Sequence, residues 1–180
     1  DGTIIPERVD TMWGTDLTTT ITGEGQAAVF VAVDHCSAEG VGLHAHARAT
    51  RFQALEPIRQ GVRRHFGGFA KAIARGLALR HDHGSQYMSD HFQKELAFLG
   101  IESSPAFVRA PEGNGCAERF IRTLKENLLW VRTFETIEEL RQALLAFRET
   151  YNNSWLIKRH GFLTPAEYRR QHLQPHAQAA

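Results

Sequence analysis

The sequence lacks the features of a membrane protein, of a secreted protein and of a fold that is held by disulfides. No apolar run approaches the ~18 consecutive residues that cross a bilayer, and the N-terminus lacks the charged-then-apolar pattern of a signal peptide. Only two cysteines are present, Cys36 and Cys116, without the C-x-x-C spacing of a zinc knuckle. We therefore expect a soluble, intracellular protein with reduced thiols and no membrane partner.

An excess of one charge is also missing. The formal net charge is +1, which by itself says little about partners. Residues 1–50 hold two basic and seven acidic side chains, so the positive surplus lies C-terminal, which is compatible with a phosphate-binding face. With 180 residues and 42% hydrophobic content, the chain can form one sizeable core. It begins with Asp1 rather than Met, so we expect a fragment of a longer protein.

Three extended segments are predicted in the first part of the chain. Residues 12–21 alternate between two faces, with Asp16 on the second face together with Gly14 and Thr18. Residues 27–33 are continuously apolar, which is typical of a strand covered on both sides. A third strand is expected at about 40–45. The short turns between these segments predict an antiparallel meander.

The later chain alternates helical and extended patterns. Apolar spacing predicts helices over residues 50–66, 89–99, 114–130 and 136–151, with Thr50, Ser89, Asn114 and Thr136 as their capping residues, and a short helix after Thr164-Pro165. Extended segments are expected at 77–79 and 101–107, and a mobile loop at 108–115. We divide the chain into an N-terminal extension (1–10), a core (11–153) and a C-terminal extension with a short helix (154–180).

Three carboxylates stand where a metal-dependent site would need them. Asp16 lies on the first strand, Asp82 follows a later strand, and Glu118 projects from a helix, with 35 residues between the last two. Carboxylates brought within a few ångströms repel one another, so such a cluster is stable mainly when divalent cations lie among them. Hard oxygen ligands favour Mg²⁺ or Mn²⁺, and two such ions would stabilise an in-line phosphodiester displacement.

The polar side of the 114–130 helix adds positive charge to these acids. At ~100° per residue, Arg122 and Lys125 share a stripe with Glu118, opposite a buried stripe. Five sets of residues then carry a family resemblance: 13–18 (WGTDLT), 81–87 (HDHGSQY), 100–104 (GIESS), 113–120 (GNGCAERF) with 124–126 (LKE), and 151–152 (YN) with 159–160 (RH) and 164–165 (TP). Together they resemble the integrase catalytic core, in the retroviral type found in bacterial insertion-sequence transposases, over roughly residues 10–170.

This resemblance implies an α/β, ribonuclease H-like fold with a mixed five-stranded sheet flanked by helices. It implies Asp16, Asp82 and Glu118 as the catalytic, metal-binding triad of a DNA transposase or integrase, a polynucleotidyl transferase with Mg²⁺ or Mn²⁺, two ions, as cofactor. Such enzymes nick DNA at a transposon end with water and then use the 3′-hydroxyl to attack another phosphodiester. The loop at 111–115 would be the mobile active-site loop.

The resemblance also implies partners. Lys125 and Arg122 would contact DNA, and Arg119 and Asn114 are further candidates. The DNA would comprise transposon ends and target, bound by a homo-oligomer, dimer or higher, in the bacterial cytoplasm at the nucleoid. Two departures bear on which DNA end is recognised: histidines flank Asp82, and residues 154–158 lengthen the interval before Arg159.

Other interpretations remain open from the sequence alone. The same fold could belong to a ribonuclease H-like nuclease that cuts without joining, or to a non-catalytic DNA-binding or dimerisation module. Glu118 and Arg122 could form an ordinary i, i+4 ion pair. Histidine pairs at 44/46 and 81/83 could suggest zinc, although no four-ligand set is present. His81 or His83 could help to position substrate. Three aromatic residues are interpreted as core or interface residues rather than base-stacking ones: Trp130, Trp155 and Phe162.

Overall fold

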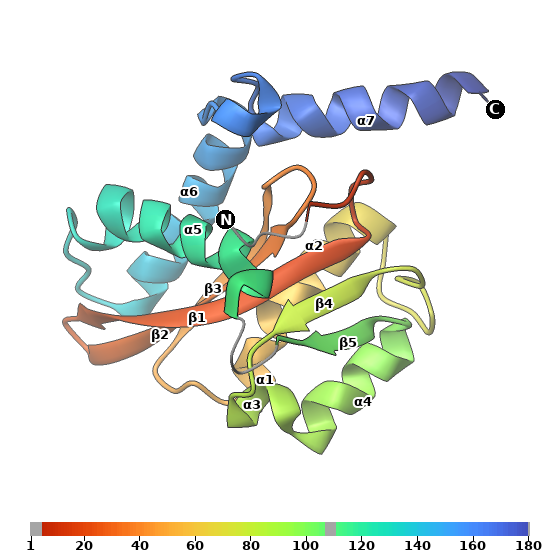
Figure 1. Ribbon diagram of the computed structural model, residues 1–180. Helices are drawn as coiled ribbons and strands as arrows, with labels where there is room; N and C mark the ends of the chain where they lie inside the picture. The colour runs from red at the N-terminus through yellow and green to blue at the C-terminus, as the bar shows by residue number, and fades with distance from the viewer. Residues whose placement is uncertain (1–4, 107–110, 180) are drawn as a thin grey trace.

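A five-stranded mixed sheet forms the centre of the computed structural model, which describes residues 5–106 and 111–179 (Figure 1). The strands are β1 (Met12–Thr22), β2 (Gly25–Asp34), β3 (Gly40–His46), β4 (Ala78–His81) and β5 (Glu102–Pro105). Their order in the sheet is β3-β2-β1-β4-β5. The β1–β2 and β2–β3 pairs are antiparallel, whereas β1–β4 and β4–β5 are parallel. The predicted meander and the mixed sheet flanked by helices are therefore confirmed.

Strand β2 is covered on both sides, as its unbroken apolar run predicts. Phe30 belongs to the hydrophobic cluster on one face of the sheet, while its neighbours Val29 and Val31 belong to the cluster on the other face. Because successive side chains of a strand point to opposite faces, one apolar segment can supply two cores. The sheet thus separates two layers of helices.

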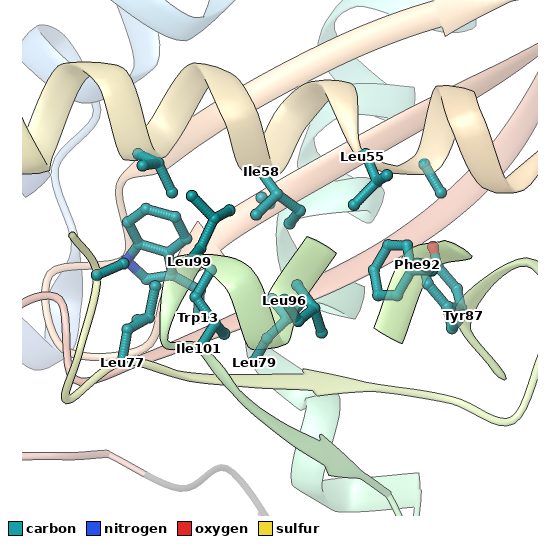
Figure 2. Close-up of a cluster of buried hydrophobic side chains, with 14 of the residues drawn as sticks. Trp13, Leu55, Ile58, Leu77, Leu79, Tyr87, Phe92, Leu96, Leu99 and Ile101 are labelled. Atoms are coloured by element: carbon teal, nitrogen blue, oxygen red, sulfur yellow. The ribbon is translucent and has the colours of Figure 1, made fainter. Parts of the chain in front are cut away.

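The first layer contains four helices, two of them from a single predicted segment. They are α1 (Arg51–Ala54), α2 (Glu56–Phe66), α3 (Ser85–Met88) and α4 (Asp90–Leu99). The prediction of one helix over 50–66 was wrong at Leu55, where α1 ends. Pro57 has no amide hydrogen to continue the α1 hydrogen-bond ladder, and it lies in the first turn of α2, where that hydrogen is not needed. Trp13, Ile58 and Phe92 belong to one buried cluster under α2, in which Figure 2 shows Trp13 and Phe92 at opposite ends and Ile58 between them.

The second layer consists of α5 (Gly115–Leu124), a π-helical turn η2 (Lys125–Leu129) and α6 (Ile137–Ser154), preceded by the 3₁₀ turn η1 (Pro111–Asn114). The predicted buried stripe is confirmed, since Phe120, Leu124 and Leu128 all pack in the second cluster. The Thr136 hydroxyl caps α6 by accepting a hydrogen bond from the Glu139 amide, 3.0 Å away. Within the described ranges, no helix has the length and apolarity that a bilayer crossing would require.

The C-terminal segment comprises η3 (Lys158–His160) and α7 (Pro165–Ala179). Helix α7 has 15 residues and is thus longer than the short helix predicted. It runs past the end of α6 and away from the sheet (Figure 1). The Thr164 hydroxyl accepts a hydrogen bond from the Glu167 amide at its start, 3.1 Å away. The division into extensions and core at residues 10 and 153 stays a prediction.

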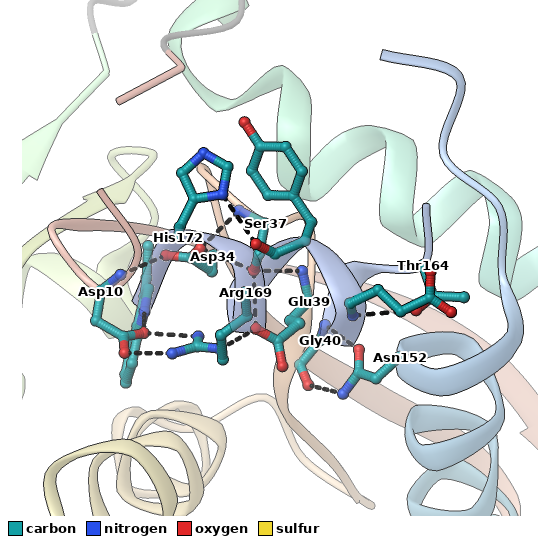
Figure 3. Close-up of polar contacts among 12 residues, drawn as sticks. Asp10, Asp34, Ser37, Glu39, Gly40, Asn152, Thr164, Arg169 and His172 are labelled. Carbon is teal, nitrogen blue, oxygen red and sulfur yellow. Dashed lines mark hydrogen bonds and ion pairs between the residues drawn. The ribbon is translucent and has the colours of Figure 1, made fainter. Parts of the chain in front are cut away.

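A buried ionic network joins α7 to the turn between β2 and β3 (Figure 3). Arg169 donates to both carboxylate oxygens of Asp10, at 2.6 and 2.9 Å, and also to Glu39. Asp34 accepts hydrogen bonds from the amide and the hydroxyl of Ser37, at 2.8 and 2.9 Å. Every acid in this network has partners within the chain, as buried charges require.

Three residues of the motif formed by 151–152 (YN) and 159–160 (RH) contact the same turn. The Asn152 side chain accepts from the Gly40 amide at 2.9 Å and donates to the Gly40 carbonyl at 3.0 Å. The His160 ring lies 2.9 Å from the Ser37 carbonyl, and Arg159 donates to the Cys36 and His35 carbonyls. These motif residues therefore hold a turn of the sheet.

Candidate functional site

Two predicted site residues come to the same level of the sheet because their strands are parallel neighbours. Gly14 of β1 pairs with Arg80 of β4. Asp16 lies two residues beyond Gly14, and Asp82 lies two residues beyond Arg80, just past the end of β4. Parallel strands keep their register, so both carboxylates lie at the same level of the sheet, Asp16 within β1 and Asp82 just past the end of β4. Asp16 is half-buried and Asp82 is exposed.

Glu118 reaches this region from the first turn of α5. Asn114, just before that helix, was predicted to cap it, but its side chain makes no cap hydrogen bond. Its Nδ2 instead donates to the carbonyl of Thr15, 3.0 Å away. Thr15 immediately precedes Asp16, so this bond ties the start of the Glu118 helix to the strand of Asp16. A Cβ on Gly14 would lie 2.5 Å from Asn114 Oδ1, so glycine makes room for the contact.

A cavity of about 510 Å³ lies between β1 and the polar side of α5. It brings Asp16 and Glu118 together with the predicted cations Arg122 and Lys125. Asp82 is not among the lining residues, and its Oδ1 accepts a hydrogen bond from the Gly84 amide, 2.7 Å away. The full lining comprises Asp16, Leu17, Thr18, Glu118, Ile121, Arg122, Lys125, Glu126 and Trp130.

The charges of the site act on the pKa of Asp16 in both directions. Burial raises this pKa to about 6 and the charges of Asp82 and Glu118 raise it as well, whereas a hydrogen bond from the Leu17 amide and the charge of Lys125 lower it. In the part of the chain that the structure describes, no three His, Cys, Asp or Glu side chains are placed to hold one metal ion. The three carboxylates are thus electrostatic neighbours, and they do not form a closed coordination shell.

The predicted DNA-contact residues divide between two sides of α5. Arg122 Nε donates to Glu126 Oε1, 2.9 Å away, so its ion pair is with Glu126 rather than with Glu118. Lys125 lines the cavity of Asp16, but Arg119 faces a second cavity of about 630 Å³ that is also lined by Trp155. Only part of the predicted set therefore shares the acidic cavity.

The histidines that flank Asp82 differ in setting. The His81 ring is buried, with Nδ1 2.6 Å from the Asp82 carbonyl and Nε2 2.7 Å from the Ser103 hydroxyl of β5. Burial lowers its pKa below the usual range. It therefore joins β4 to the edge strand β5 from inside the protein, whereas His83 is exposed. Of the predicted loop 108–115, residues 108–110 lie outside the described residues, and 111–114 form η1.

Sequence reasoning did not place Trp130 at this cavity. Trp130 and Phe162 were interpreted as core or interface aromatics; they are 68% and 60% exposed, so they are not core residues, and the interface interpretation stays a prediction. Trp155 is half-buried and stacks on Tyr151. The signal that could have been used is local: Trp130 follows Lys125 and Glu126 on the same polar helix. The π-helical turn that orients it has no sequence pattern of its own.

Comparison of the sequence with known proteins finds a matching family model and related sequences. Residues 99–165 match the family model described as integrase core domain. Over 79 residues the chain is 38% identical to the transposase for insertion sequence element IS904 of Lactococcus lactis, covering 44% of the chain and 31% of that protein. Over 148 residues it is 26% identical to transposase InsD for insertion element IS2D of Escherichia coli, covering 79% of the chain and 47% of that protein. The chain thus spans less than half the length of these relatives.

Solved structures show the fold. The catalytic core domain of BIV integrase superposes with a TM-score of 0.66 at 20% identity, covering 95% of this chain and 99% of that one. The HTLV-2 integrase catalytic core domain in complex with magnesium, in its dimeric form, gives 0.64 at 17% identity, covering 92% and 98%. A chain of the simian T-cell lymphotropic virus intasome gives 0.68 at 18% identity, covering 92% and 56%.

The fold is therefore that of retroviral integrase catalytic cores, the ribonuclease H-like fold predicted from the motifs. Within that class, residues 99–165 match the integrase core domain family model, and the related sequences are transposases of bacterial insertion sequences. The predicted resemblance is confirmed.

Proposed function

We propose that this chain is the catalytic core of a DNA transposase, which cleaves DNA at a transposon end and joins it to a target. The observation that carries the proposal is the cavity in which Asp16 and Glu118 face Arg122 and Lys125, with Asp82 at the same level of the adjacent strand. Acids for metal ions and cations for phosphates are the two parts that phosphoryl transfer needs.

The donor set suits Mg²⁺ or Mn²⁺. The three acids offer only hard oxygen ligands, and burial raises the pKa of Asp16, with a further contribution from the charges of Asp82 and Glu118 that a cation would offset. We propose Asp16, Asp82 and Glu118 as the ligands of two such ions, which supply Lewis-acid stabilisation of the attacking and leaving oxygens. The asymmetry of the site, with Asp82 outside the cavity, means that its side chain must turn from Gly84 to join the others.

The cations would hold the DNA backbone. Lys125 and Arg122 lie on the cavity wall next to Glu118, so a bound phosphodiester would be kept near the acids. We propose Arg119 and Asn114 as further contacts, with Asn114 also holding α5 against β1. The partners would be transposon ends and target DNA. An oligomer on DNA is supported by the intasome and dimeric forms among the structural neighbours, and a bacterial cytoplasmic, nucleoid location by the related transposases.

The test is a strand-transfer assay on labelled DNA that carries the ends of the parent element, with Mg²⁺ or Mn²⁺ and the full-length protein. Asp16→Asn, Asp82→Asn and Glu118→Gln should each abolish both cleavage and joining, whereas Glu102→Gln, an exposed acid on β5, should not. Products that are cut but never joined would identify a nuclease instead. Activity that survives in all three variants would reject the triad.

A further inference from the structure

Trp130 is a large aromatic residue on the wall of a cavity that is lined by both acidic and basic side chains. Its side chain is 68% exposed, and it lines the same cavity as Asp16 and Glu118. An exposed indole costs hydrophobic free energy, so its position calls for a ligand that would cover it. Neither metal binding nor phosphate binding uses such a flat apolar surface.

The π-helical turn before Trp130 places the indole beside Lys125. The Trp130 amide donates to the Lys125 carbonyl, 2.9 Å away, across five residues instead of the usual four. In a regular α-helix, residues five apart lie about 140° apart around the axis, so these two side chains would diverge. The wider π turn brings them toward one side, and Lys125 Nζ lies 6.0 Å from the centre of the Trp130 ring.

This juxtaposition matches one chemical unit. A nucleotide carries an anionic phosphate and a flat base on the same sugar, which suits an ammonium group next to an exposed indole. A base inside a duplex keeps both faces stacked, so only an unpaired base can use the indole. Protein partners fit less well, since the cavity is lined by charged side chains of both signs.

We propose that Trp130 is a stacking platform for an unpaired nucleobase of the DNA strand at the active site, with Lys125 holding an adjoining phosphate. The proposal rests on the proposed function, because it takes the cavity to be the DNA site. In addition to the scissile phosphate, the cavity would therefore bind a single-stranded or frayed nucleotide. Stacking tolerates any base, so Trp130 would favour strand separation over a particular sequence.

Binding is tested on the 180-residue chain with a duplex that carries a short single-stranded overhang containing 2-aminopurine, in EDTA so that no chemistry occurs. Trp130→Ala should weaken binding of the overhang DNA by roughly tenfold or more, whereas Trp130→Phe should stay within about threefold of the parent chain. The 2-aminopurine fluorescence should be quenched by the parent chain and by Trp130→Phe, but not by Trp130→Ala. Val131→Ala is the matched control, since Val131 is 65% exposed and does not line the cavity.

Three outcomes would overturn the proposal. They are unchanged overhang binding by Trp130→Ala, an equal loss on blunt and overhang duplexes, and a change in the sedimenting mass of the chain without a change in DNA binding. The last would make Trp130 a protein contact. Failure of the proposed function is a separate result: Asp16→Asn and Glu118→Gln would keep strand transfer, whatever the fluorescence of the overhang shows.

Discussion

The protein holds two sets of three acids, and their surroundings are opposite. Asp10, Asp34 and Glu39 lie in the network of the β2–β3 turn, where Arg169 and Ser37 supply hydrogen bonds and ion pairs. Asp16, Asp82 and Glu118 have no salt bridge within the described residues, and two of them are exposed. The first set has its hydrogen-bond and ion-pair partners inside the chain, so it serves the fold. The second leaves charge for ligands from outside.

The largest expected effect is a loss of activity without a loss of stability. In Asp16→Asn the rate of strand transfer should fall on the order of 10³-fold, because stabilisation of several kcal/mol in the transition state is lost. The free energy of unfolding should stay equal or rise by about 1 kcal/mol, since burial and like charges disfavour the ionised Asp16. Urea titration alongside the assay checks this. A variant that loses both activity and stability would make Asp16 structural.

Arg169→Met should have the opposite profile. It leaves Asp10 and Glu39 without their guanidinium in a buried site, so the free energy of unfolding should fall by about 3–5 kcal/mol. The neighbouring exposed Arg170→Gln is the control and should change it by less than about 0.5 kcal/mol. A small effect of Arg169→Met, measured by urea titration, would show that the two sets of acids do not differ in kind.

The pH dependence of stability tests where the two sets resemble each other, since burial raises the pKa of both Asp34 and Asp16 to about 6. Burial raises the pKa of Asp34 to about 6, from 3.8 for an unperturbed group. The folded state therefore binds the extra proton between these values, and Asp34 makes stability decline as the pH rises from about 4 to 6. Asp34→Asn should remove this decline, which is of order 1–3 kcal/mol. Unfolding curves of both proteins across that range, at fixed salt, test it; identical slopes would contradict the assignment.

Asn114→Ala should have the smallest combined effect on activity and stability. Loss of the hydrogen bond to the Thr15 carbonyl should lower the free energy of unfolding by about 1 kcal/mol. The rate of strand transfer should fall by more than that loss of folded protein explains, because Glu118 is no longer held against the strand of Asp16. Asn127→Ala, which removes an exposed hydrogen bond within the same helical segment, is the control. Equal activities in the two variants would show that Asn114 does not position Glu118.

Local patterns predicted much of the fold. The alternation of β1, the unbroken apolar run of β2 and the Ser89 and Thr136 caps each depend on residues near in sequence, and all are confirmed. That Asp16 and Asp82 lie side by side in the sheet could be expected only in outline, because their alignment depends on the parallel register of β1 and β4.

The features that were missed depend on distant contacts or on backbone geometry. The break at Leu55 and the π turn at Lys125–Leu129 change the phase of helices whose apolar spacing looks regular. Asn114 was read as a cap, because nothing local shows that Thr15 lies beside it. The roles of Asn152 and His160 were likewise hidden, since the backbone groups they bind belong to a turn more than a hundred residues earlier.

The contact between Asn152 and Gly40 spans 112 positions, and it gives the chain a direction of assembly. During synthesis the β2–β3 hairpin leaves the ribosome long before α6. The peptide groups of Gly40 therefore have no hydrogen-bond partner from Asn152 until that residue has been made. Such long-range closure is slow compared with helix formation. A product released before residue 152 would carry Asp16, Asp82 and Glu118 but an open hairpin, so premature termination would yield chains that are prone to proteolysis.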